Sequence, residues 1–378
     1  MSRSDGRDGP GGGPPELETG TRRRVLEDVF DPRANALNLI RLVLALFVIV
    51  WHAFPLTGAT IDSPWARQLV SRLSVDGFFA ISGFLIVSSW IRHPRWGAFL
   101  RARALRIFPA FWVCLILTAF AFAPAALLIR GVALPQGFVS DALSYVWRNA
   151  LLRVSQFGIA GTPADVPEVG VWNGALWTLF WEFSCYLGVL AVGLTGLLRR
   201  GMTVPALFCS ALLAVLLTSY GPISNSTATI GSRLGLMFAA GALVHRYRRG
   251  IPVRGELLAL AAGLVLVAGA LPEYSPLAAL PLAYLVISLG ALGTHPRLRV
   301  RQDISYGVYI YGFPVQQLLV TAGAGALGVP FFAVVSLLAT LPLAAGSWFL
   351  VEKPALRFKG RSGRPATVQD TAVTKAPA

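Results

Sequence analysis

Hydrophobic positions in this 378-residue chain fall into ten long apolar runs, which are separated by short polar or basic segments. Each run is about 17–26 residues long, the length that an α-helix needs to cross a lipid bilayer. The pattern therefore predicts an all-α fold, a polytopic transmembrane helical bundle of about ten spans. The predicted spans are about 37–56, 75–91, 107–129, 173–198, 203–219, 229–245, 255–271, 275–294, 304–324 and 329–350.

Composition and charge support this topology. Hydrophobic residues make up 55% of the chain and charged residues 13%, and the mean hydropathy is +0.62. A soluble domain has about twice that charged fraction. The net charge of +15 would suggest nucleic acid in a soluble protein, but 26 of the 33 Lys and Arg residues lie on one predicted side of the membrane and 5 on the other. By the positive-inside rule, both termini are expected to be cytoplasmic.

The predicted transmembrane domain covers residues 35–358 of a multi-pass protein of the cytoplasmic membrane. The polar segments at the two ends, 1–34 and 359–378, are expected to be disordered cytoplasmic tails. The one sizeable outer loop, 130–172, is too short for a second enzyme domain but long enough for a lid or an acceptor platform.

Two ionisable residues, Arg41 and His52, lie within the first apolar run. Eleven residues separate them, so they share a helix face and lie roughly 16 Å apart along the axis. Ionisable groups at this depth usually face a cavity or a partner rather than lipid. We interpret His52 as a general base. The alternative is a structural histidine bonded to a neighbouring helix, with an Arg41 that snorkels to the interface.

The fourth span carries Asn173, Trp177 and Glu182 in its outer half. A lone carboxylate in an apolar helix tends to be protonated or paired. Glu182 is expected near the depth of His52, and pairing with that imidazole would orient it as the third member of a catalytic triad does. Pairing with Arg233 of the sixth span is an equally good structural alternative.

The second span begins with Asp76 and contains Ser82. At the start of a helix, Asp76 is expected either to cap the helix or to take part in catalysis. Ser82 and the glycine that follows it are also explained by close helix packing. As a nucleophile Ser82 is weak, because no base is known to lie near it.

The segment before the third span is the densest basic stretch near a membrane helix. Arg103 and Arg106 are three residues apart and share a face. Because Arg binds phosphate in a bidentate way, the pair suggests a cytoplasmic clamp for a polyphosphate ligand. An ordinary topogenic charge cluster that meets anionic lipid is the alternative.

The ninth span opens with three tyrosines within six residues, more than an interfacial belt needs. Tyr306 fits such a belt, whereas Tyr309 lies deeper and needs a hydrogen-bond partner. The sequence has no metal-ligand spacing and no phosphate-loop glycine pattern.

Taken in order, these segments resemble the membrane-bound acyltransferase-3 family of bacterial O-acyltransferases. No single motif is decisive, but their order and spacing over residues 35–358 are specific. The resemblance rests on Arg41 with His52, Asp76 to Phe84, Arg103 with Arg106 and Pro109, Trp177 to Glu182, Ser305 to Tyr309, and Glu352-Lys353-Pro354.

The resemblance implies an acyl-CoA donor, most often acetyl-CoA. Its phosphates would bind Arg103 and Arg106 with help from Arg101, and its thioester would pass Arg41 to reach His52. The segment around Gly312 resembles the subgroup that acetylates exopolysaccharide or lipo-oligosaccharide units. Many members have a histidine at this position, so a second catalytic histidine is not expected here.

The sequence therefore predicts an integral membrane O-acyltransferase that acts on a glycan or glycolipid hydroxyl, with acyl-CoA, the acceptor and membrane lipids as partners and no nucleic acid. The alternatives are a macrolide or other small-molecule acyltransferase and a non-catalytic transporter of acyl-CoA or lipid-linked sugar. The predicted catalytic residues are His52, Glu182, Arg41 and Asp76. The predicted substrate-binding residues are Trp177, Asn173, Ser82, Tyr306, Tyr309 and Arg233.

Overall fold

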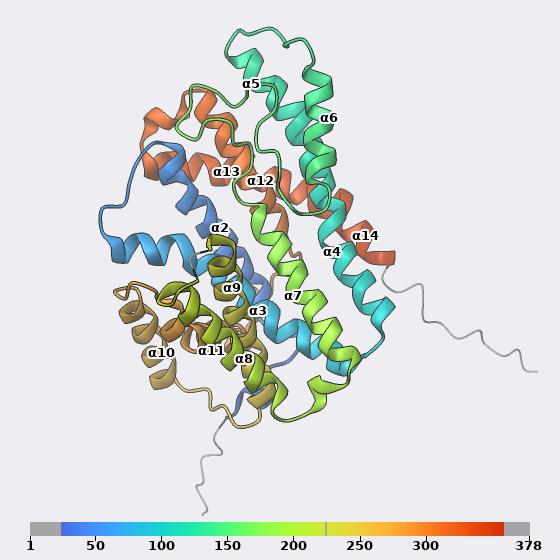
Figure 1. The fold of residues 1–378 in the computed structure, drawn as a ribbon, viewed down its shortest axis with the longest axis vertical. Coiled ribbons are helices and arrows are strands. Elements are labelled where there is room, and N and C mark those ends of the chain that lie inside the picture. Colours follow the sequence, from blue (N-terminus) through green and yellow to red (C-terminus); the bar gives the residue numbers. More distant parts are fainter. Residues whose placement is uncertain (1–23, 224, 359–378) are drawn as a thin grey trace, which may run out of the picture.

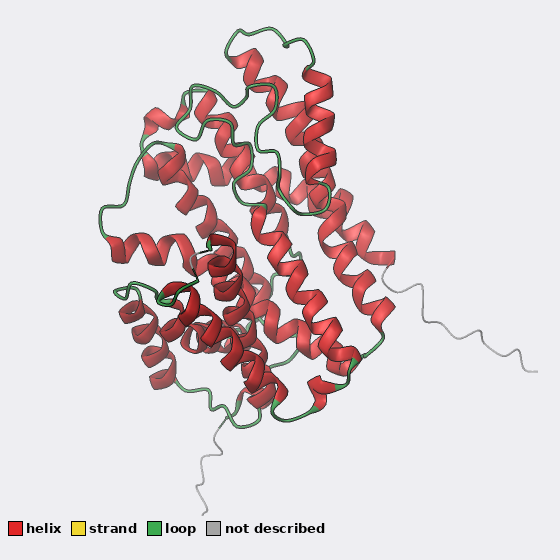
Figure 2. Cartoon of the chain, in the orientation of Figure 1, coloured by secondary structure: helices red, strands yellow, loops and turns green. Residues whose placement is uncertain are grey.

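The computed structural model describes residues 24–223 and 225–358. Within these ranges the regular secondary structure is helical, and the only β-pairings are two isolated bridges (Figure 2). The predicted all-α class is thus confirmed. Most of the predicted tails, residues 1–23 and 359–378, lies outside the described residues.

Each of the ten predicted spans coincides with a helix or a stack of consecutive helices (Figure 1). Two of these stacks contain a π-helical turn, η1 (Thr118–Phe122) and η5 (Trp348–Glu352). In chain order the spans correspond to α2 (Leu37–Leu56), α3 (Pro64–Arg92), α4 (Trp96–Leu117) with α5 (Ala123–Ile129), α7 (Trp177–Leu194), α8 (Thr203–Ser219), α9 (Ser226–Tyr247), α10 (Gly255–Ala268), α11 (Ser275–Leu292), α12 (Ser305–Thr321), and α13 (Val329–Ser347) with α14 (Lys353–Arg357).

Seven helical segments of the described chain are long and apolar enough to cross a membrane, so the multi-pass architecture is confirmed. The other three predicted spans are shorter helices. They are α8, α10 and α12, with 17, 14 and 17 residues. The count of ten full spans therefore holds only as ten helical segments, of which seven have spanning length.

Close contact between α3 and α9 organises one half of the bundle. A Cβ atom on Gly83 would lie 1.9 Å from the carbonyl oxygen of Phe238, and one on Gly241 would lie 1.8 Å from that of Ala80. No real Cβ atom tolerates such distances, so both positions require glycine. The packing role proposed for the glycine after Ser82 is thus borne out, as in other small-residue helix interfaces in membranes.

The most deeply buried helix is α12, where every residue from 305 to 317 is buried. It packs between α2 and α13. Close approach to α2 again needs a small residue, because a Cβ on Gly312 would lie 2.8 Å from the Ile49 side chain. A larger side chain at this position would therefore require the Ile49 side chain to move.

The second span differs most from its prediction. Helix α3 begins at Pro64, eleven residues before the expected start near 75, and the Ser63 hydroxyl accepts a hydrogen bond from the Ala66 amide at 3.3 Å as its N-cap. Asp76 therefore lies inside the helix and does not cap it. The early start was missed because Arg67, Gln68 and Arg72 interrupt the apolar pattern of this first part.

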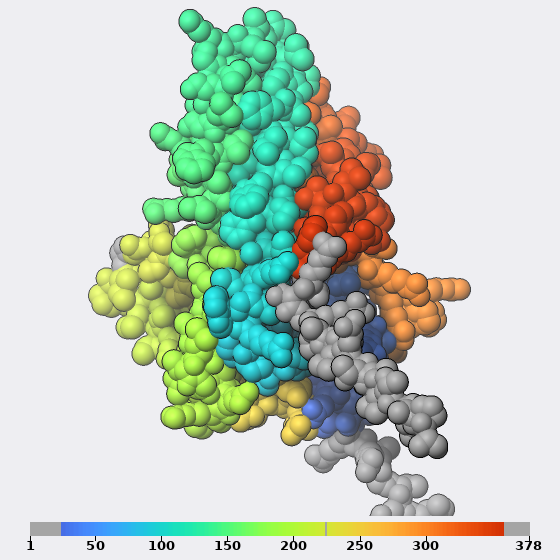
Figure 3. Space-filling model, turned by 90° about the vertical axis from the view of Figure 1, so that its right-hand side faces the viewer, coloured from blue at the N-terminus to red at the C-terminus, as the bar shows by residue number. Residues whose placement is uncertain are grey.

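The two ends of the bundle have different character. We call the end that carries residues 24–36, 92–96, 246–254 and 293–303 the terminal face. Part of the predicted N-terminal tail is ordered there, because α1 (Leu26–Val29) packs on the chain after α9 through the Leu26 amide and the Ile251 carbonyl at 2.8 Å. In Figure 3, α4 runs beside the C-terminal helices, which its contacts with α14 and η5 confirm.

The opposite end, the loop face, carries residues 57–63, 130–176 and 269–274. The long loop contains α6 (Phe138–Asn149), and its second part closes over the end of α12. There the Gln317 side chain donates hydrogen bonds to the carbonyls of Glu168 and Val171 at 2.8 and 2.7 Å. This long loop lies at the top of Figure 1.

Candidate active site

Near the terminal face, four charged side chains form an ion-pair cluster, two from α2 and α4, one from η5 and one from the turn just before α12. One carboxylate oxygen of Asp303 accepts from Arg41 at 2.5 Å and from Arg106 at 2.7 Å. Arg106 also pairs with Glu352 at 3.0 Å and stacks over the Tyr306 ring. Burial alone would raise the pKa of Asp303, but the guanidinium groups of Arg106 and Arg41 outweigh it and lower the pKa to about 2.

This cluster changes the predicted role of Arg106. Both of its terminal nitrogens bind carboxylates, so the structure engages Arg106 in the cluster and gives its predicted phosphate role no geometric support. The sequence reasoning missed its two acidic partners. Asp303, just before the ninth span, and Glu352, a lone acid at the end of the last apolar run, were the available signals.

The other two predicted phosphate ligands remain available. Arg103 donates to the Ser89 hydroxyl at 3.2 Å and stacks over Phe99, while its buried Nε has no hydrogen-bond partner among the described residues. Arg101 is exposed at the terminal face, and its side chain makes no hydrogen bond or ion pair in the described part of the chain. An orphaned buried donor and an exposed cation on the same helix end suit an anionic ligand.

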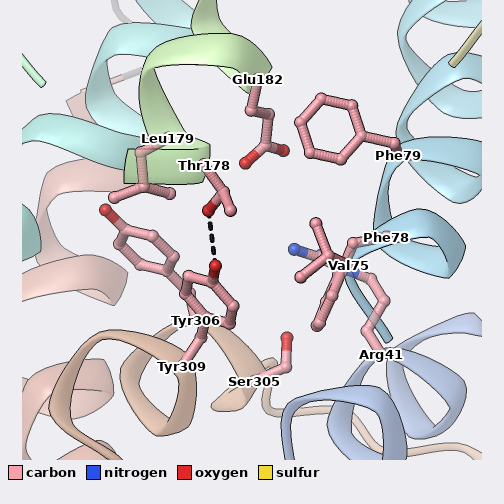
Figure 4. A pocket seen from close by; sticks show the side chains of 10 residues that line it. All are labelled: Arg41, Val75, Phe78, Phe79, Thr178, Leu179, Glu182, Ser305, Tyr306 and Tyr309. Carbon is pink, nitrogen blue, oxygen red and sulfur yellow. Dashed lines mark hydrogen bonds between the residues drawn. The ribbon is translucent and has the colours of Figure 1, made fainter. Parts of the chain in front are cut away.

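Between the ion-pair cluster and the middle of the bundle lies a narrow inner cavity. Figure 4 shows Glu182 and Thr178 of α7 facing Tyr306 and Tyr309 of α12 across it, with Arg41 at its edge. Phe78, Phe79 and Val75 of α3 form the remaining side. The cavity has room for only about 30 Å³ of water-sized molecules.

Glu182 takes neither of the two partners expected from the sequence. Its carboxylate accepts from the Ser82 hydroxyl at 3.1 Å and from the hydroxyl of Tyr186. In the described residues it has no bond to His52 or to Arg233, so the expected triad is not formed. The correction has a simple geometric cause: Glu182 lines the inner cavity, whereas His52 lines a different one.

His52 faces an outer cavity with Trp51, Ser71 and Trp177. Its ring packs edge-on against Phe313 at a centroid distance of 4.9 Å and has a hydrogen bond to the backbone of Val48, one helical turn earlier. The predicted alternative of a histidine bonded to a neighbouring helix is not observed, because this bond lies within α2.

The inner and outer cavities share three wall residues, Val75, Thr178 and Tyr309. The hydroxyls of Thr178 and Tyr309 are hydrogen-bonded to each other (Figure 4), and Tyr309 also donates to the Ala175 carbonyl at 2.9 Å. These side chains therefore form a partition between the two cavities. Tyr309 thus has the deep partner that the sequence required. Thr178 lies within the Trp177 to Glu182 motif, but that pattern predicted no site role for it.

Asp76 and Arg233 belong to a separate buried network. Asp76 is fully buried, accepts from Arg233 at 3.1 Å and from the Tyr274 hydroxyl, and lines neither cavity. Because these bonds join α3 to α9 and to the start of α11, we interpret them as structural. The catalytic role expected for Asp76 and the substrate-binding role expected for Arg233 gain no geometric support.

Two more predicted substrate ligands are engaged in helix packing. The Asn173 amide donates to the Ile310 carbonyl at 2.8 Å, and its oxygen accepts from the Ala175 amide at 3.1 Å. Tyr306 donates to the Ile107 carbonyl at 2.8 Å, although its ring still lines the inner cavity. Asn173 therefore holds the segment that leads into α7 against α12 rather than facing a cavity.

Comparison with known proteins gives consistent matches over most of the chain. Residues 34–349 match the family described as an acyltransferase domain. An O-acetyl transferase of Shigella phage Sf6 is 30% identical over 87% of this chain and 97% of its own length. Nodulation protein 10 of Rhizobium leguminosarum bv. viciae is 30% identical over 86% of this chain and 94% of its own length. No solved structure matches significantly.

Proposed function

Since this chain belongs to the acyltransferase-3 family and is a multi-pass membrane O-acetyltransferase, we propose that it transfers acetyl from cytosolic acetyl-CoA to a glycan hydroxyl at the loop face, with His52 as the general base. We place the terminal face in the cytoplasm of a bacterial cell, as the positive-inside rule favours. The enzyme class leaves no support for the alternative of a non-catalytic transporter.

One observation carries the proposal: the cavity that His52 lines and the cavity that Arg41 and Glu182 line share the walls Val75, Thr178 and Tyr309. Two adjoining cavities, each with some polar side chains in its wall, therefore extend from the ion-pair cluster to the imidazole, with this partition between them. Ionisable side chains that face cavities inside a membrane bundle are typical of a substrate path or a reaction centre.

His52 has the contacts that a base needs. A ring nitrogen that donates to the Val48 carbonyl leaves the other nitrogen as an acceptor. In the described residues no carboxylate neutralises the ring or holds a proton on it. We infer that His52 takes the proton of the acceptor hydroxyl while the acceptor oxygen forms its bond to the acetyl carbon, and that His52 returns the proton to sulfur as the carbon–sulfur bond breaks.

We place the acetyl-CoA site at the terminal face and keep two of its three predicted phosphate ligands. Arg103, with its orphaned Nε, and the free Arg101 would hold phosphate groups, whereas Arg106 stays in the ion-pair cluster. When bound, acetyl-CoA supplies a thioester-activated acetyl group. Glu182, held by Ser82 and Tyr186, and Tyr309 remain as polar wall groups beside the path.

The test is acetyl transfer to cell-surface glycan by His52→Ala and His52→Gln in membranes, with His93→Ala as the matched control. His93 is exposed at the terminal face, so its loss is expected to leave activity unchanged. Loss of a general base lowers the rate about 10²–10⁴-fold. Transfer at the wild-type rate by a membrane-inserted His52→Ala protein would eliminate His52 as the base, and transfer to a macrolide instead of glycan would favour the small-molecule alternative.

A further inference from the structure

A third cavity opens on the loop face and leads toward His52. It measures about 700 Å³ and lies between the start of α3 and the loop from α10 to α11. This is the size of a site for a small ligand. We call it the vestibule and define it by Trp51, Trp65, Arg67, Gln68, Arg72 and the loop 269–272.

The vestibule adjoins the His52 cavity. Trp51 and Ser71 line both, and Trp51 directly precedes His52 on α2. A molecule that enters from the loop face therefore meets the vestibule first and the imidazole next. The outer cavity itself has room for only about 80 Å³, so the bulk of any acceptor must remain in the vestibule while one hydroxyl reaches His52.

The wall of the vestibule is fixed in place by hydrogen bonds. The Gln68 amide donates to the carbonyls of Gly269 and Leu271 at 3.0 and 2.8 Å. The Trp65 indole N–H donates to the Leu266 carbonyl at 2.7 Å. These bonds hold the loop between α10 and α11 against α3, so the vestibule is formed before any ligand arrives.

The lining has one sign of charge and exposed aromatic surface. Arg67 is exposed and has no side-chain hydrogen bond or ion pair in the described ranges. Arg72 pairs with Glu273 at 2.8 Å and stacks over the Tyr274 ring, yet 33% of its side chain stays exposed. Among the residues that the structure describes, no acidic side chain lines the vestibule. Trp65 is 42% exposed, and its indole offers a broad apolar face to a sugar ring.

The geometry points to the vestibule as the acceptor site, specific for a saccharide that carries a phosphate or carboxylate group near the hydroxyl to be acetylated. This inference rests on the proposed function, because it assumes that His52 marks the point of transfer. Arg67 binds the anionic group, and Trp51 and Trp65 contact the sugar. Phosphate and carboxylate are recognised by the same guanidinium chemistry, so the experiment separates them.

The experiment measures binding without acetyl transfer. The full chain is placed in phosphatidylcholine nanodiscs, and labelled glucose 1-phosphate, glucuronic acid and neutral glucose are titrated by equilibrium dialysis. The variants are Arg67→Gln and Arg67→Lys. Arg153→Gln is the matched control, because Arg153 is an exposed loop-face arginine that does not line the vestibule.

We expect saturable binding of at least one anionic probe and at least tenfold weaker binding of glucose. Arg67→Gln should weaken the binding of that probe about tenfold or more, as expected for the loss of one charge-assisted hydrogen bond. Arg67→Lys should retain part of the affinity, and Arg153→Gln should retain all of it. Tighter binding of glucose 1-phosphate would indicate a phosphate-linked acceptor, and tighter binding of glucuronic acid a uronic acid.

The inference is overturned if glucose binds as tightly as the anions, if Arg67→Gln changes nothing, if Arg153→Gln weakens binding equally, or if neither anion saturates up to about 10 mM. A phospholipid headgroup is another source of phosphate. Loss of probe binding in phosphatidylglycerol nanodiscs at equal ionic strength would assign the vestibule to lipid and also overturn the inference.

Failure of this inference is distinguishable from failure of the proposed function. His52→Ala should abolish acetyl transfer yet leave probe binding unchanged, since the imidazole does not line the vestibule. If probe binding fails while His52→Ala still abolishes transfer, only the acceptor site is wrong. If His52→Ala retains transfer, the proposed base is wrong whatever the probes show.

Discussion

The ion-pair cluster and His52 border two adjoining cavities but differ in how their ionisable groups are satisfied. In the cluster, Arg41 and Arg106 each contact a carboxylate within 3.0 Å, and Asp303 serves both. His52 has one backbone bond, an aromatic neighbour and no charged partner in the described chain. The cluster is electrostatically complete, whereas the imidazole keeps a ring nitrogen for a substrate.

This difference separates structural from chemical roles better than residue type does. A buried charge that loses its partner is strongly destabilising, so substitutions in the cluster should mainly lower the stability of the fold. A histidine without a charged partner adds little to the fold but is free to move a proton. Variants of the cluster should therefore show their main loss in thermal stability, and variants of His52 should show it in the rate of acetyl transfer.

The largest effect is expected from Asp303→Asn. This change removes the carboxylate that Arg41 and Arg106 share and leaves two guanidinium groups in a mostly buried site with one remaining acidic partner, Glu352. Breaking a buried pair in this way costs about 3–5 kcal/mol. The measurement is the thermal unfolding midpoint of purified protein in detergent.

A surface ion pair provides the control for Asp303→Asn. Glu27 contacts Arg248 at 3.1 Å and Arg249 at 2.8 Å at the terminal face, where Arg249 is largely exposed. Exposed pairs contribute about 0–1 kcal/mol, so Glu27→Gln should barely move the midpoint. Equal losses for Asp303→Asn and Glu27→Gln would show that the cluster is not the buried structural unit that its geometry indicates.

Acid should weaken the cluster by a smaller amount. The folded pKa of Asp303, about 2, lies below its ordinary value of 3.8. A depressed carboxyl pKa contributes stability that is fully present above pH 3.8 and is lost as the pH falls through 2. The difference corresponds to about 2 kcal/mol. Unfolding midpoints between pH 5 and 2 should therefore fall more steeply for the wild type than for Asp303→Asn, and parallel curves would contradict this assignment.

The sequence predicted the helices well because a membrane helix is marked by a local run of apolar residues. Apolar run length placed the bounds of α2 and α8 at Leu37–Leu56 and Thr203–Ser219, as observed. Pattern failed at α3, whose first part is helical but polar because it lines the vestibule. A hydropathy signal cannot distinguish polar helix from loop at a membrane surface.

Partner choice in the site was not predictable in the same way. The position of Glu182 along its helix placed it at the same membrane depth as His52. Depth alone does not say toward which neighbouring helix a side chain points. In the structure Glu182 binds Ser82 and Tyr186, and Arg233 binds Asp76. These choices depend on how α3, α7 and α9 pack, which one sequence does not encode in any local pattern.

Arg103 and Arg106 extend the comparison between chemical and structural roles. They are three residues apart, yet we expect Arg103 to bind the donor and Arg106 to stabilise the fold. Arg103→Gln should raise the KM for acetyl-CoA about tenfold, as expected when one charge-assisted hydrogen bond is lost, with little change in kcat. Arg106 is held by Asp303 and Glu352, so Arg106→Gln should instead lower stability. Initial rates over a range of acetyl-CoA concentrations measure the first effect, and the thermal midpoint measures the second.

The matched control for Arg103→Gln is Arg95→Gln. Arg95 is exposed at the N-cap of α4, on the same basic segment, and makes no side-chain bond in the described residues. A tenfold rise in KM for Arg95→Gln as well would reduce the segment to a general attraction for anions. An unchanged KM for Arg103→Gln would remove Arg103 from the donor site.

The smallest effect concerns the partition between the two cavities. Thr178→Val keeps the shape of the side chain but removes its hydroxyl from Tyr309, which retains its bond to the Ala175 carbonyl. The loss of stability should be about 1 kcal/mol, and the freed Tyr309 ring should open the partition more often. If the cavities form one path, hydrolysis of acetyl-CoA without acceptor should rise about fivefold, the factor that corresponds to 1 kcal/mol.

Thr340→Val separates opening of the partition from general loosening of the bundle. Thr340 is also a fully buried threonine, and its hydroxyl bonds only within α13, to the Ser336 carbonyl at 2.7 Å, away from both cavities. It should lose a similar amount of stability with no rise in hydrolysis. A rise in both variants would mean that loosening alone admits water. A rise in neither would mean that the donor does not pass between Thr178 and Tyr309, and the His52 and Glu182 cavities would then be neighbours without a shared path.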